Sequence, residues 1–330
     1  MTDAAAMERV LVIKLGALGD FLLALGPMQA IRRAHPAARL TLLTRTAYRG
    51  LAEASGLFDT IWIDPAPKLN PLAWLALRQK LRGGRFQRVY DLQTSDRSAA
   101  YFRLMGGAGG PQWSGKVPGC SHRHVYQAPS PLHTVDRQRE QLAVAGITDV
   151  PLSDLSFLDA PIADRLPARP FALLIPGASP GRPAKRWPAD RFGALASRLD
   201  ARGLGSVVAG TDGESGLAHA IQAQAPEALD LTGATSLADL AAVARAARLV
   251  IGNDTGPTHL AALAGAPTLA LFSADSDPGR TGPRGPHTRW LQRDDLADLD
   301  EAAVLAAIGD WVTDDPRLTG DLTGADAPGR

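Results

Sequence analysis

Short apolar runs alternate with longer segments of helical periodicity throughout the first half of the chain. The run 10–14 (Val-Leu-Val-Ile-Lys) has no polar residue before its last position, which is typical of a strand buried on both faces of a parallel sheet. A turn with two glycines follows it, and the next apolar segment ends before Pro36. This pattern predicts strands at 10–14, 40–44, 60–63 and 88–92, and helices at 21–35, 71–81 and 135–145.

The second half repeats this alternation. Strands that alternate with helices indicate an α/β fold with parallel sheets. A length of 330 residues suits two domains of about 150 residues each, and a proline-rich stretch at 159–170 separates the halves. The second half is predicted to contain strands at 171–175, 206–209, 248–251 and 268–272, and helices at 191–201, 215–225, 236–246, 258–264 and 302–311.

We therefore expect two Rossmann-like domains and a tail. The first domain is predicted over 1–165 and the second over 166–315, and a disordered tail is predicted over 316–330, where Gly, Asp and Thr are frequent. Ligands of open parallel sheets bind beyond the carboxyl ends of the strands. Two such domains predict a ligand site in a cleft between them, formed by the loops that follow strands.

The bulk composition excludes several classes of protein. The net charge is only +1, whereas nucleic-acid-binding domains are usually strongly basic, so no nucleic-acid partner is expected. The single cysteine, Cys120, allows neither an intramolecular disulfide nor a zinc site of several cysteines, which favours a reducing compartment. Because Lys14, Asp20 and Gln29 interrupt the apolar stretch 10–31, it predicts neither a membrane span nor an export signal, and we expect a cytoplasmic protein.

The loop after the first strand carries a candidate carboxylate. It reads Lys14-Leu-Gly-Ala-Leu-Gly-Asp20 and opens a helix. The loop is not the dinucleotide-binding GxGxxG, because Leu18 stands where the second glycine should be, and the chain contains no GxxxxGK[ST]. Asp20 is therefore either a residue that faces a ligand or an N-cap or first-turn residue that interacts with the helix dipole.

A cationic loop follows the first strand of the second half. Residues 176–188 contain Arg182, Lys185 and Arg186. Cations in this position suit a diphosphate, whose negative charge grows as it leaves during glycosyl transfer. The same residues are equally consistent with a solvated charged loop in which Trp187 anchors the next helix.

Two further loops of the second half suit a nucleotide. The segment 251–259 joins a strand to a helix whose first turn contains Pro257, and free N–H groups at a helix start bind phosphate. Asp254 and His259 bring side chains to the same corner, and the alternative is an Asp or Thr cap with a buried histidine. Asp212, after another strand, either holds a ribose hydroxyl or belongs to a plain strand-to-helix turn. These loops predict a nucleotide donor on the second half and an acceptor on the first.

At these loops the chain resembles the glycosyltransferase family 9 heptosyltransferases, which build the inner core of lipopolysaccharide. The resemblance extends from VLVIKLGALGD to FSADSDPGRTGPRG, and its most specific segments are LGALGD, AKRWP and LTGATSLADLAAVARAARLVIGNDTGPTHLAALAGAP, with the shorter YDLQ and HTVDRQ. It implies a GT-B fold, in which two Rossmann-like domains face each other across a cleft. It also implies an inverting, metal-independent transfer of heptose from ADP-heptose to a lipopolysaccharide-core or other lipid-linked acceptor, without a cofactor.

The resemblance implies roles for individual residues. Asp20 matches the motif aspartate that acts as general base on the acceptor hydroxyl. Lys185 matches the lysine that faces the donor phosphates, and it is the second residue with an implied catalytic role. Donor-binding roles are implied for Ser179, Asp212, Asp254, Thr255, Gly256 and His259, and no residue is implied to bind a metal.

One stretch departs from the family pattern. Family members often carry a GPTDP-like stretch after the last strand, whereas this chain has Ser273-Ala-Asp-Ser-Asp-Pro278 near the expected sugar pocket. The donor sugar is therefore left open. The alternatives are a glycosyltransferase of the same fold that uses another nucleotide sugar or a non-lipid acceptor, and a non-catalytic protein that binds nucleotide sugars.

A basic stretch in the first half bears on where the protein works. Such a stretch is consistent with peripheral contact at the cytoplasmic face of the inner membrane, where an anionic lipid-linked acceptor would lie. It is also consistent with the solvated face of an amphipathic helix. The cations are Lys68, Arg78, Lys80, Arg82, Arg85 and Arg88, and they surround Trp74 and Leu75.

Overall fold

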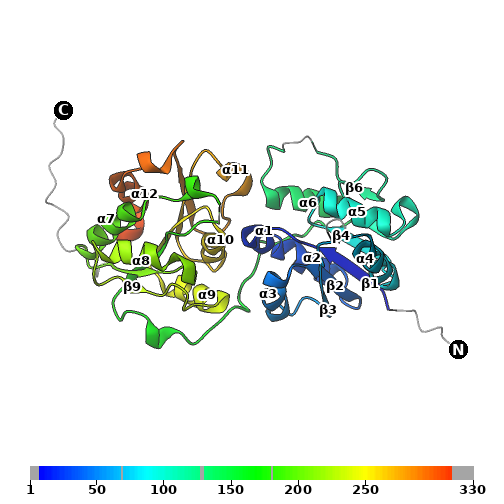
Figure 1. The fold of residues 1–330 in the computed structure, drawn as a ribbon, viewed down its shortest axis with the longest axis horizontal. Coiled ribbons are helices and arrows are strands. Elements are labelled where there is room, and N and C mark those ends of the chain that lie inside the picture. The colour runs from blue at the N-terminus through cyan, green and yellow to red at the C-terminus, as the bar shows by residue number, and fades with distance from the viewer. Residues whose placement is uncertain (1–6, 68–69, 127–129, 180, 314–330) are drawn as a thin grey trace. The chain divides into compact units, whose positions relative to one another are not determined.

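The computed structural model describes residues 7–67, 70–126, 130–179 and 181–313. These residues form two compact units, divided between Phe157 and Leu158, and each unit is built on its own parallel sheet (Figure 1). Both sheets have six strands with helices packed on them, so the predicted α/β class is confirmed. The tail predicted at 316–330 and the basic residue Lys68 lie outside the described residues.

The first unit has the strand order β3-β2-β1-β4-β5-β6, and all its neighbouring strands are parallel. This is the order of Rossmann sheets, in which the direction of the connections reverses between the two central strands, here β1 and β4. The elements are β1 (Arg9–Ile13), α1 (Leu18–Leu23), α2 (Leu25–Ala34), β2 (Arg39–Thr44), α3 (Arg49–Ala54), β3 (Thr60–Ile63), α4 (Pro71–Gly83), β4 (Arg88–Asp91), α5 (Asp96–Leu104), β5 (Gln112–Gly115), β6 (His122–Arg123) and α6 (Thr134–Val144).

The helix predicted at 21–35 is in fact two helices. α1 begins at Leu18 and ends at Leu23, and α2 begins at Leu25. Because Pro27 has no N–H to donate to the carbonyl of Leu23, a continuous helix would lose a hydrogen bond there, and the chain starts a new helix instead. The earlier start at Leu18 brings Asp20 into the first turn of a helix.

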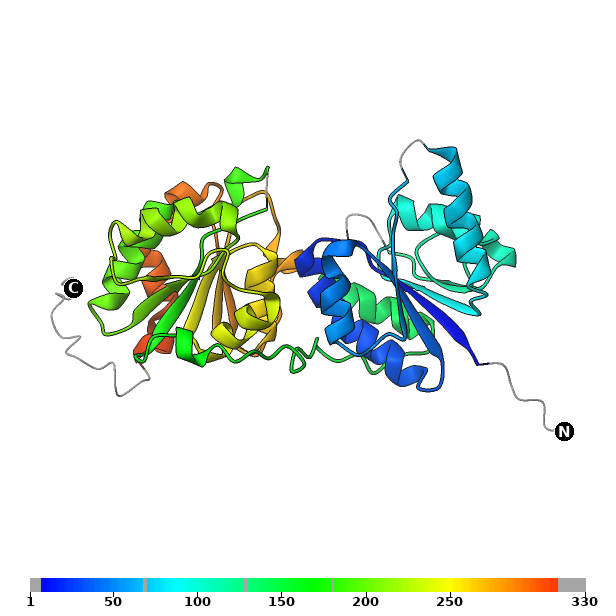
Figure 2. The ribbon, with the colours of Figure 1, turned by 60° about the horizontal axis from the view of Figure 1, so that its bottom comes forward.

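The second unit has the order β12-β11-β10-β7-β8-β9, which is again the Rossmann order, with β7 and β10 at the centre. Figure 2 shows its strands flanked by helices. Trp187 and Phe192 pack edge to face in its core. The elements are β7 (Phe171–Ile175), α7 (Ala189–Asp200), β8 (Gly205–Val208), α8 (Ser215–Gln222), β9 (Leu229–Asp230), α9 (Leu237–Ala246), β10 (Leu249–Asn253), α10 (Gly256–Leu263), β11 (Thr268–Phe272), α11 (Pro278–Thr281), β12 (Thr288–Gln292) and α12 (Glu301–Thr313).

The division between the units lies slightly before the predicted boundary of 165 and 166. Residues from Leu158 onward belong to the second unit. The Leu158 carbonyl accepts a hydrogen bond of 2.6 Å from Arg245 on α9, and Arg165 donates one of 2.8 Å to the Ala234 carbonyl. The proline-rich stretch is therefore held on the second unit by hydrogen bonds that its composition does not reveal.

Candidate active site

The central strands of the second unit bring two of the predicted loops together. β7 and β10 are paired neighbours, with Ile175 opposite Gly252. Their carboxyl ends therefore open at the same point, where the direction of the connections reverses and where ligands of such sheets bind. The loop after β7 leads to a short 3-10 helix, η4 (Pro183–Lys185), and the loop after β10 leads into α10.

Lys185 and Asp254 form an ion pair at this point. The Lys185 Nζ lies 2.6 Å from the Asp254 Oδ2, and the two side chains are only 15% and 9% exposed. The His259 Nε2 lies 3.9 Å from the other carboxylate oxygen, which is an electrostatic contact longer than a hydrogen bond. Three of the predicted site residues thus lie together, although Lys185 is 69 residues before Asp254 in the sequence.

The ion pair keeps Asp254 ionised although it is buried. Burial alone would raise the pKa of Asp254, because a low-dielectric surrounding disfavours the charged form. Polar contacts with His259, Lys185 and Ser276 outweigh burial and lower that pKa from 3.8 to about 2. At neutral pH the corner therefore contains a fixed carboxylate that orients a lysine ammonium.

The depressed pKa predicts a pH dependence of stability. A carboxyl group with a folded pKa of about 2 and an unfolded pKa of 3.8 contributes stability above pH 3.8, and this contribution is lost as the pH falls through about 2. The contribution of Asp254 is about 2 kcal/mol. We expect urea unfolding at pH 5, 4 and 3 to show a stability gap between wild type and Asp254→Asn that narrows toward low pH. A gap that stays constant over this range would contradict the assignment.

The start of α10 has free backbone donors. Thr255 is its N-cap residue but makes no side-chain cap hydrogen bond, so the alternative of an ordinary Thr cap is wrong. The Thr255 hydroxyl lies 3.3 Å from that of Thr258, which donates instead to the Asn253 carbonyl. The Gly256 and Thr258 N–H groups have no acceptor among the residues that the structure describes, so they remain for an anionic ligand, whereas Pro257 has no N–H. His259 is 5% exposed, so the part of that alternative that has a buried histidine agrees with the structure.

Asn253 connects these loops and was not among the predicted site residues. Its side chain is fully buried, and its Oδ1 accepts a 3.0 Å hydrogen bond from the Trp187 N–H. Its Nδ2 donates to the carbonyls of Pro176 and Gly177, at 2.8 and 3.2 Å. One amide thus fixes the loop after β7, the chain beyond Lys185 and the end of β10 relative to one another.

The remaining predicted donor residues lie outside this cluster. Ser179 is exposed on the loop after β7, and its carbonyl accepts a hydrogen bond from the Arg182 N–H. Asp212 is exposed in the short 3-10 helix η5 (Asp212–Glu214), which follows β8. The other two cations of the predicted loop are also separate from the ion pair, since Arg182 is exposed and Arg186 donates to the Ala178 carbonyl. Of the three cations, the structure brings only Lys185 to Asp254.

In the first unit, Asp20 stands after β1, at the equivalent edge of the sheet. The N-cap of α1 is Ala17, so Asp20 is not an N-cap but a first-turn residue. Its side chain is partly exposed, and no described residue donates a hydrogen bond to its carboxylate. A Cβ on Gly16 would lie 2.9 Å from the Asp20 Oδ2, so glycine makes room for the carboxylate.

Two buried ionisable groups lie at the same edge of the sheet. Lys14, at the end of β1, is 4% exposed and donates a 3.3 Å hydrogen bond to the Leu92 carbonyl. Burial lowers the pKa of Lys14, although Asp20 and Asp91 oppose this shift electrostatically. Burial likewise raises the pKa of Asp91 to about 6, against hydrogen bonds from Thr94, Ser98 and Gln93.

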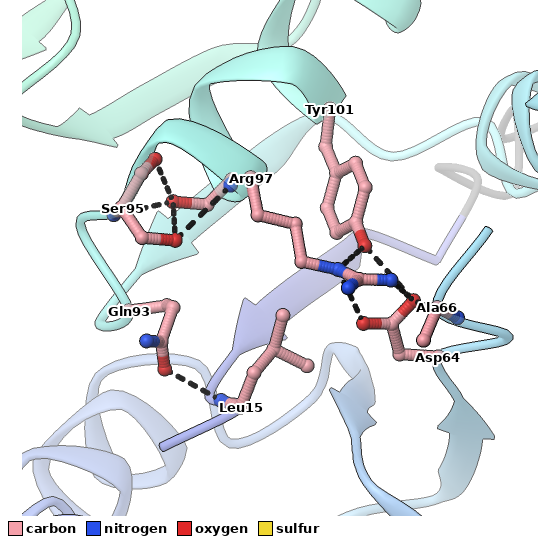
Figure 3. Close-up of polar contacts among 8 residues, drawn as sticks. Leu15, Asp64, Ala66, Gln93, Ser95, Arg97 and Tyr101 are labelled. Atoms are coloured by element: carbon pink, nitrogen blue, oxygen red, sulfur yellow. Dashed lines mark hydrogen bonds and ion pairs between the residues drawn. The ribbon is translucent and has the colours of Figure 1, made fainter. Parts of the chain in front are cut away.

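A partly exposed arginine is held at the same edge. Arg97, on α5, pairs with the buried Asp64 after β3, with 2.8 Å between its Nε and the carboxylate (Figure 3). The Tyr101 hydroxyl donates a 2.8 Å hydrogen bond to Asp64 and accepts one of 2.5 Å from Arg97. Figure 3 also shows the Leu15 N–H bonded to Gln93, which ties the loop after β1 to the loop after β4. Asp64 lies 33 residues before Arg97, so no local pattern reveals the pair.

Two features are absent from the part of the chain that the structure describes. No three His, Cys, Asp or Glu side chains gather in a way that suits a metal ion, and metal independence stays a prediction. No helix there has the length and apolar character needed to cross a bilayer.

Comparisons with known proteins agree with this arrangement. The family model of glycosyltransferase family 9 (heptosyltransferase) matches residues 74–302, which is more than half of the chain. Lipopolysaccharide heptosyltransferase 1 of Pseudomonas aeruginosa is 29% identical over 303 residues, which cover 84% of this chain and 81% of that protein.

Solved structures show the same fold. The family 9 glycosyltransferase of Veillonella parvula superimposes with a TM-score of 0.77 at 22% identity, over 92% of this chain and 97% of that one. An Escherichia coli heptosyltransferase solved with ADP gives a TM-score of 0.72 at 21% identity, over 92% and 99%. The predicted GT-B fold class is therefore confirmed. The extent of the family match shows that this chain belongs to glycosyltransferase family 9, the heptosyltransferase family, and is a sugar-transferring enzyme.

Proposed function

We propose that the protein transfers a heptose from ADP-heptose to a lipopolysaccharide-core or other lipid-linked acceptor, with inversion and without a metal. The observation that carries this proposal is the Lys185–Asp254 ion pair beside the uncapped start of α10. That corner offers a cation and free N–H groups to a diphosphate. Membership of the heptosyltransferase family supports heptose as the transferred sugar, and the Escherichia coli relative solved with ADP supports ADP as the nucleotide.

In this mechanism Asp20 is the general base. Its carboxylate takes the proton of the acceptor hydroxyl while the hydroxyl oxygen attacks the anomeric carbon of the donor sugar. The bond from that carbon to the diphosphate oxygen breaks, and ADP leaves. A single attack opposite the leaving group inverts the anomeric configuration. The partial exposure of Asp20 supports this role, because a base must reach the proton that it takes.

The second unit supplies the donor contacts. Lys185, oriented by Asp254, balances the charge that grows on the diphosphate, and His259 contacts the same carboxylate. The backbone at Thr255 and Gly256 donates to the phosphates at the start of α10. Asp212 holds the ribose, and the exposed Ser179 makes a further donor contact.

The acceptor is assigned to the first unit. Arg97 is 32% exposed and is fixed by Asp64 and Tyr101 at the edge of the sheet that carries Asp20. A cation in this position suits an anionic group of the acceptor. The Pseudomonas aeruginosa relative is named for lipopolysaccharide, which supports a lipid-linked acceptor. We place the enzyme in the cytoplasm, in peripheral contact with the inner membrane.

Calorimetric titration with ADP, UDP, GDP and NAD, without added metal, tests the donor assignment. We expect ADP to bind and the other three to bind at least tenfold more weakly. A preference for UDP or GDP would keep glycosyl transfer but discard ADP-heptose, an outcome that the unusual stretch Ser273–Pro278 makes worth including. ADP binding without sugar transfer to any acceptor would favour a non-catalytic protein that binds nucleotide sugars.

A further inference from the structure

A long segment of the first unit carries charge of only one sign. Residues 65–90 contain six Lys or Arg and no Asp or Glu, although the whole chain has a net charge of only +1. The segment includes α4 (Pro71–Gly83) and the turn that leads into β4. Figure 2 shows α4 at the outer edge of the unit drawn in blue and cyan.

The exposed face of α4 is apolar in its first half. Leu72 and Leu75 are 77% and 47% exposed, and Ala76, four residues after Leu72, lies on the same face. The opposite face packs into the core through Leu77 and Leu81. Leu72 and Leu75 therefore form a small exposed apolar patch on the same helix that carries Lys80 and Arg82.

The second half of α4 and its surroundings are basic. A hollow of about 220 Å³ is lined by Arg9, Arg39 and Lys80, and the Lys80 ammonium lies 4.9 Å from the Trp62 ring. A second hollow of about 320 Å³ lies beside it and is lined by Arg82 and Arg85. No carboxylate lines either hollow, and none of these five cations forms an ion pair with a carboxylate among residues 7–67, 70–126 and 130–157.

We propose that α4 and these five cations form a docking surface for a bilayer that contains anionic phospholipid. The apolar face at Leu72 and Leu75 enters the boundary between headgroups and acyl chains, while the two hollows receive lipid phosphates. This inference rests on the proposed function in one respect, since a lipid-linked acceptor explains why the enzyme would dock.

The leucines favour a membrane over a nucleic acid. A phosphodiester backbone would be matched by the cations alone, and nucleic-acid surfaces gain little from exposed aliphatic side chains. A bilayer uses both features, because burial of each leucine adds to the electrostatic attraction.

Vesicle sedimentation of the full-length protein tests the surface. We expect binding to vesicles of phosphatidylcholine with phosphatidylglycerol, little binding to phosphatidylcholine alone, and loss of binding as NaCl is raised. The variant Lys80→Gln, Arg82→Gln, Arg85→Gln should bind on the order of a hundredfold more weakly, because each cation near an anionic surface adds about a factor of five. The variant Leu72→Ser, Leu75→Ser should weaken binding at every salt concentration.

The matched control removes the same charge elsewhere. Arg33→Gln, Arg49→Gln, Arg198→Gln replaces three exposed cations outside this surface and should bind as wild type does. Equal binding to both vesicle types, equal loss in the control variant, or binding to duplex DNA but not to vesicles would overturn the proposal.

Sugar transfer to a soluble, delipidated acceptor separates the docking proposal from the proposed function. The rate of this transfer should be the same in wild type and in the triple variant at α4. Its absence in both proteins would count against the proposed function and leave the vesicle result standing.

Discussion

Asp20→Asn is expected to lower kcat by about a thousandfold while leaving ADP binding within twofold of wild type. An amide of the same shape cannot take the proton of the attacking hydroxyl, so only the step that needs a base is lost. The carboxylate is partly exposed and has no donor among the described residues, so the substitution breaks no hydrogen bond of the fold. Single-turnover kinetics with ADP-heptose, together with calorimetry, measure both quantities.

The control for this variant is Asp190→Asn. Asp190 also stands in the first turn of a helix, α7, and its replacement removes the same charge and the same interaction with a helix dipole. We expect Asp190→Asn to keep kcat within about twofold of wild type. If Asp20→Asn turned over at the wild-type rate, the base would have to be another residue, and the assignment of Asp20 would be withdrawn.

The fold could be predicted from the sequence because its strands are buried on both faces. Continuous apolar runs such as 10–14 and 171–175 mark the central strands, and these were located within one residue. The edge strand β3 was predicted at 60–63, but the edge strands β6, β9 and β12 were missed. β6 and β9 have only two residues each, and β12 is partly exposed and lacks an apolar run. α5 was also missed, although the capping box of Ser95 and Ser98 is a local signal that marks its start.

The site could be predicted only in part. Loop positions after strands pointed to Asp20, Asp254 and the cations of residues 176–188, because ligands of parallel sheets bind beyond the carboxyl ends of the strands. The family resemblance then implied the roles of Asp20 and Lys185. The contacts that fix these residues join distant segments and leave no local pattern. Asn253 reaches back 77 residues to Pro176, and Arg97 reaches back 33 to Asp64. Position in the loop does not distinguish Arg182 from Lys185; the family resemblance singled out Lys185, and the structure pairs Lys185 with Asp254.

Lys185→Ala is expected to lower kcat/KM by at least about a hundredfold, because it removes the cation that balances the charge of the departing diphosphate. Loss of one charged hydrogen bond should also weaken ADP binding about tenfold. Arg182→Ala is the matched control from the same loop, and it should change either value less than threefold.

Lys185→Ala also leaves a buried carboxylate without its ion-pair partner, since Asp254 is only 9% exposed and loses the Lys185 ammonium. A loss of activity could then come from a loss of folding. The double variant Lys185→Ala, Asp254→Asn removes the stranded charge, so its melting temperature should lie above that of the single variant. Its activity should remain low, because the cation is still absent. Recovery of activity together with stability would show that Lys185 only supports the fold, and the catalytic assignment would then have to be withdrawn.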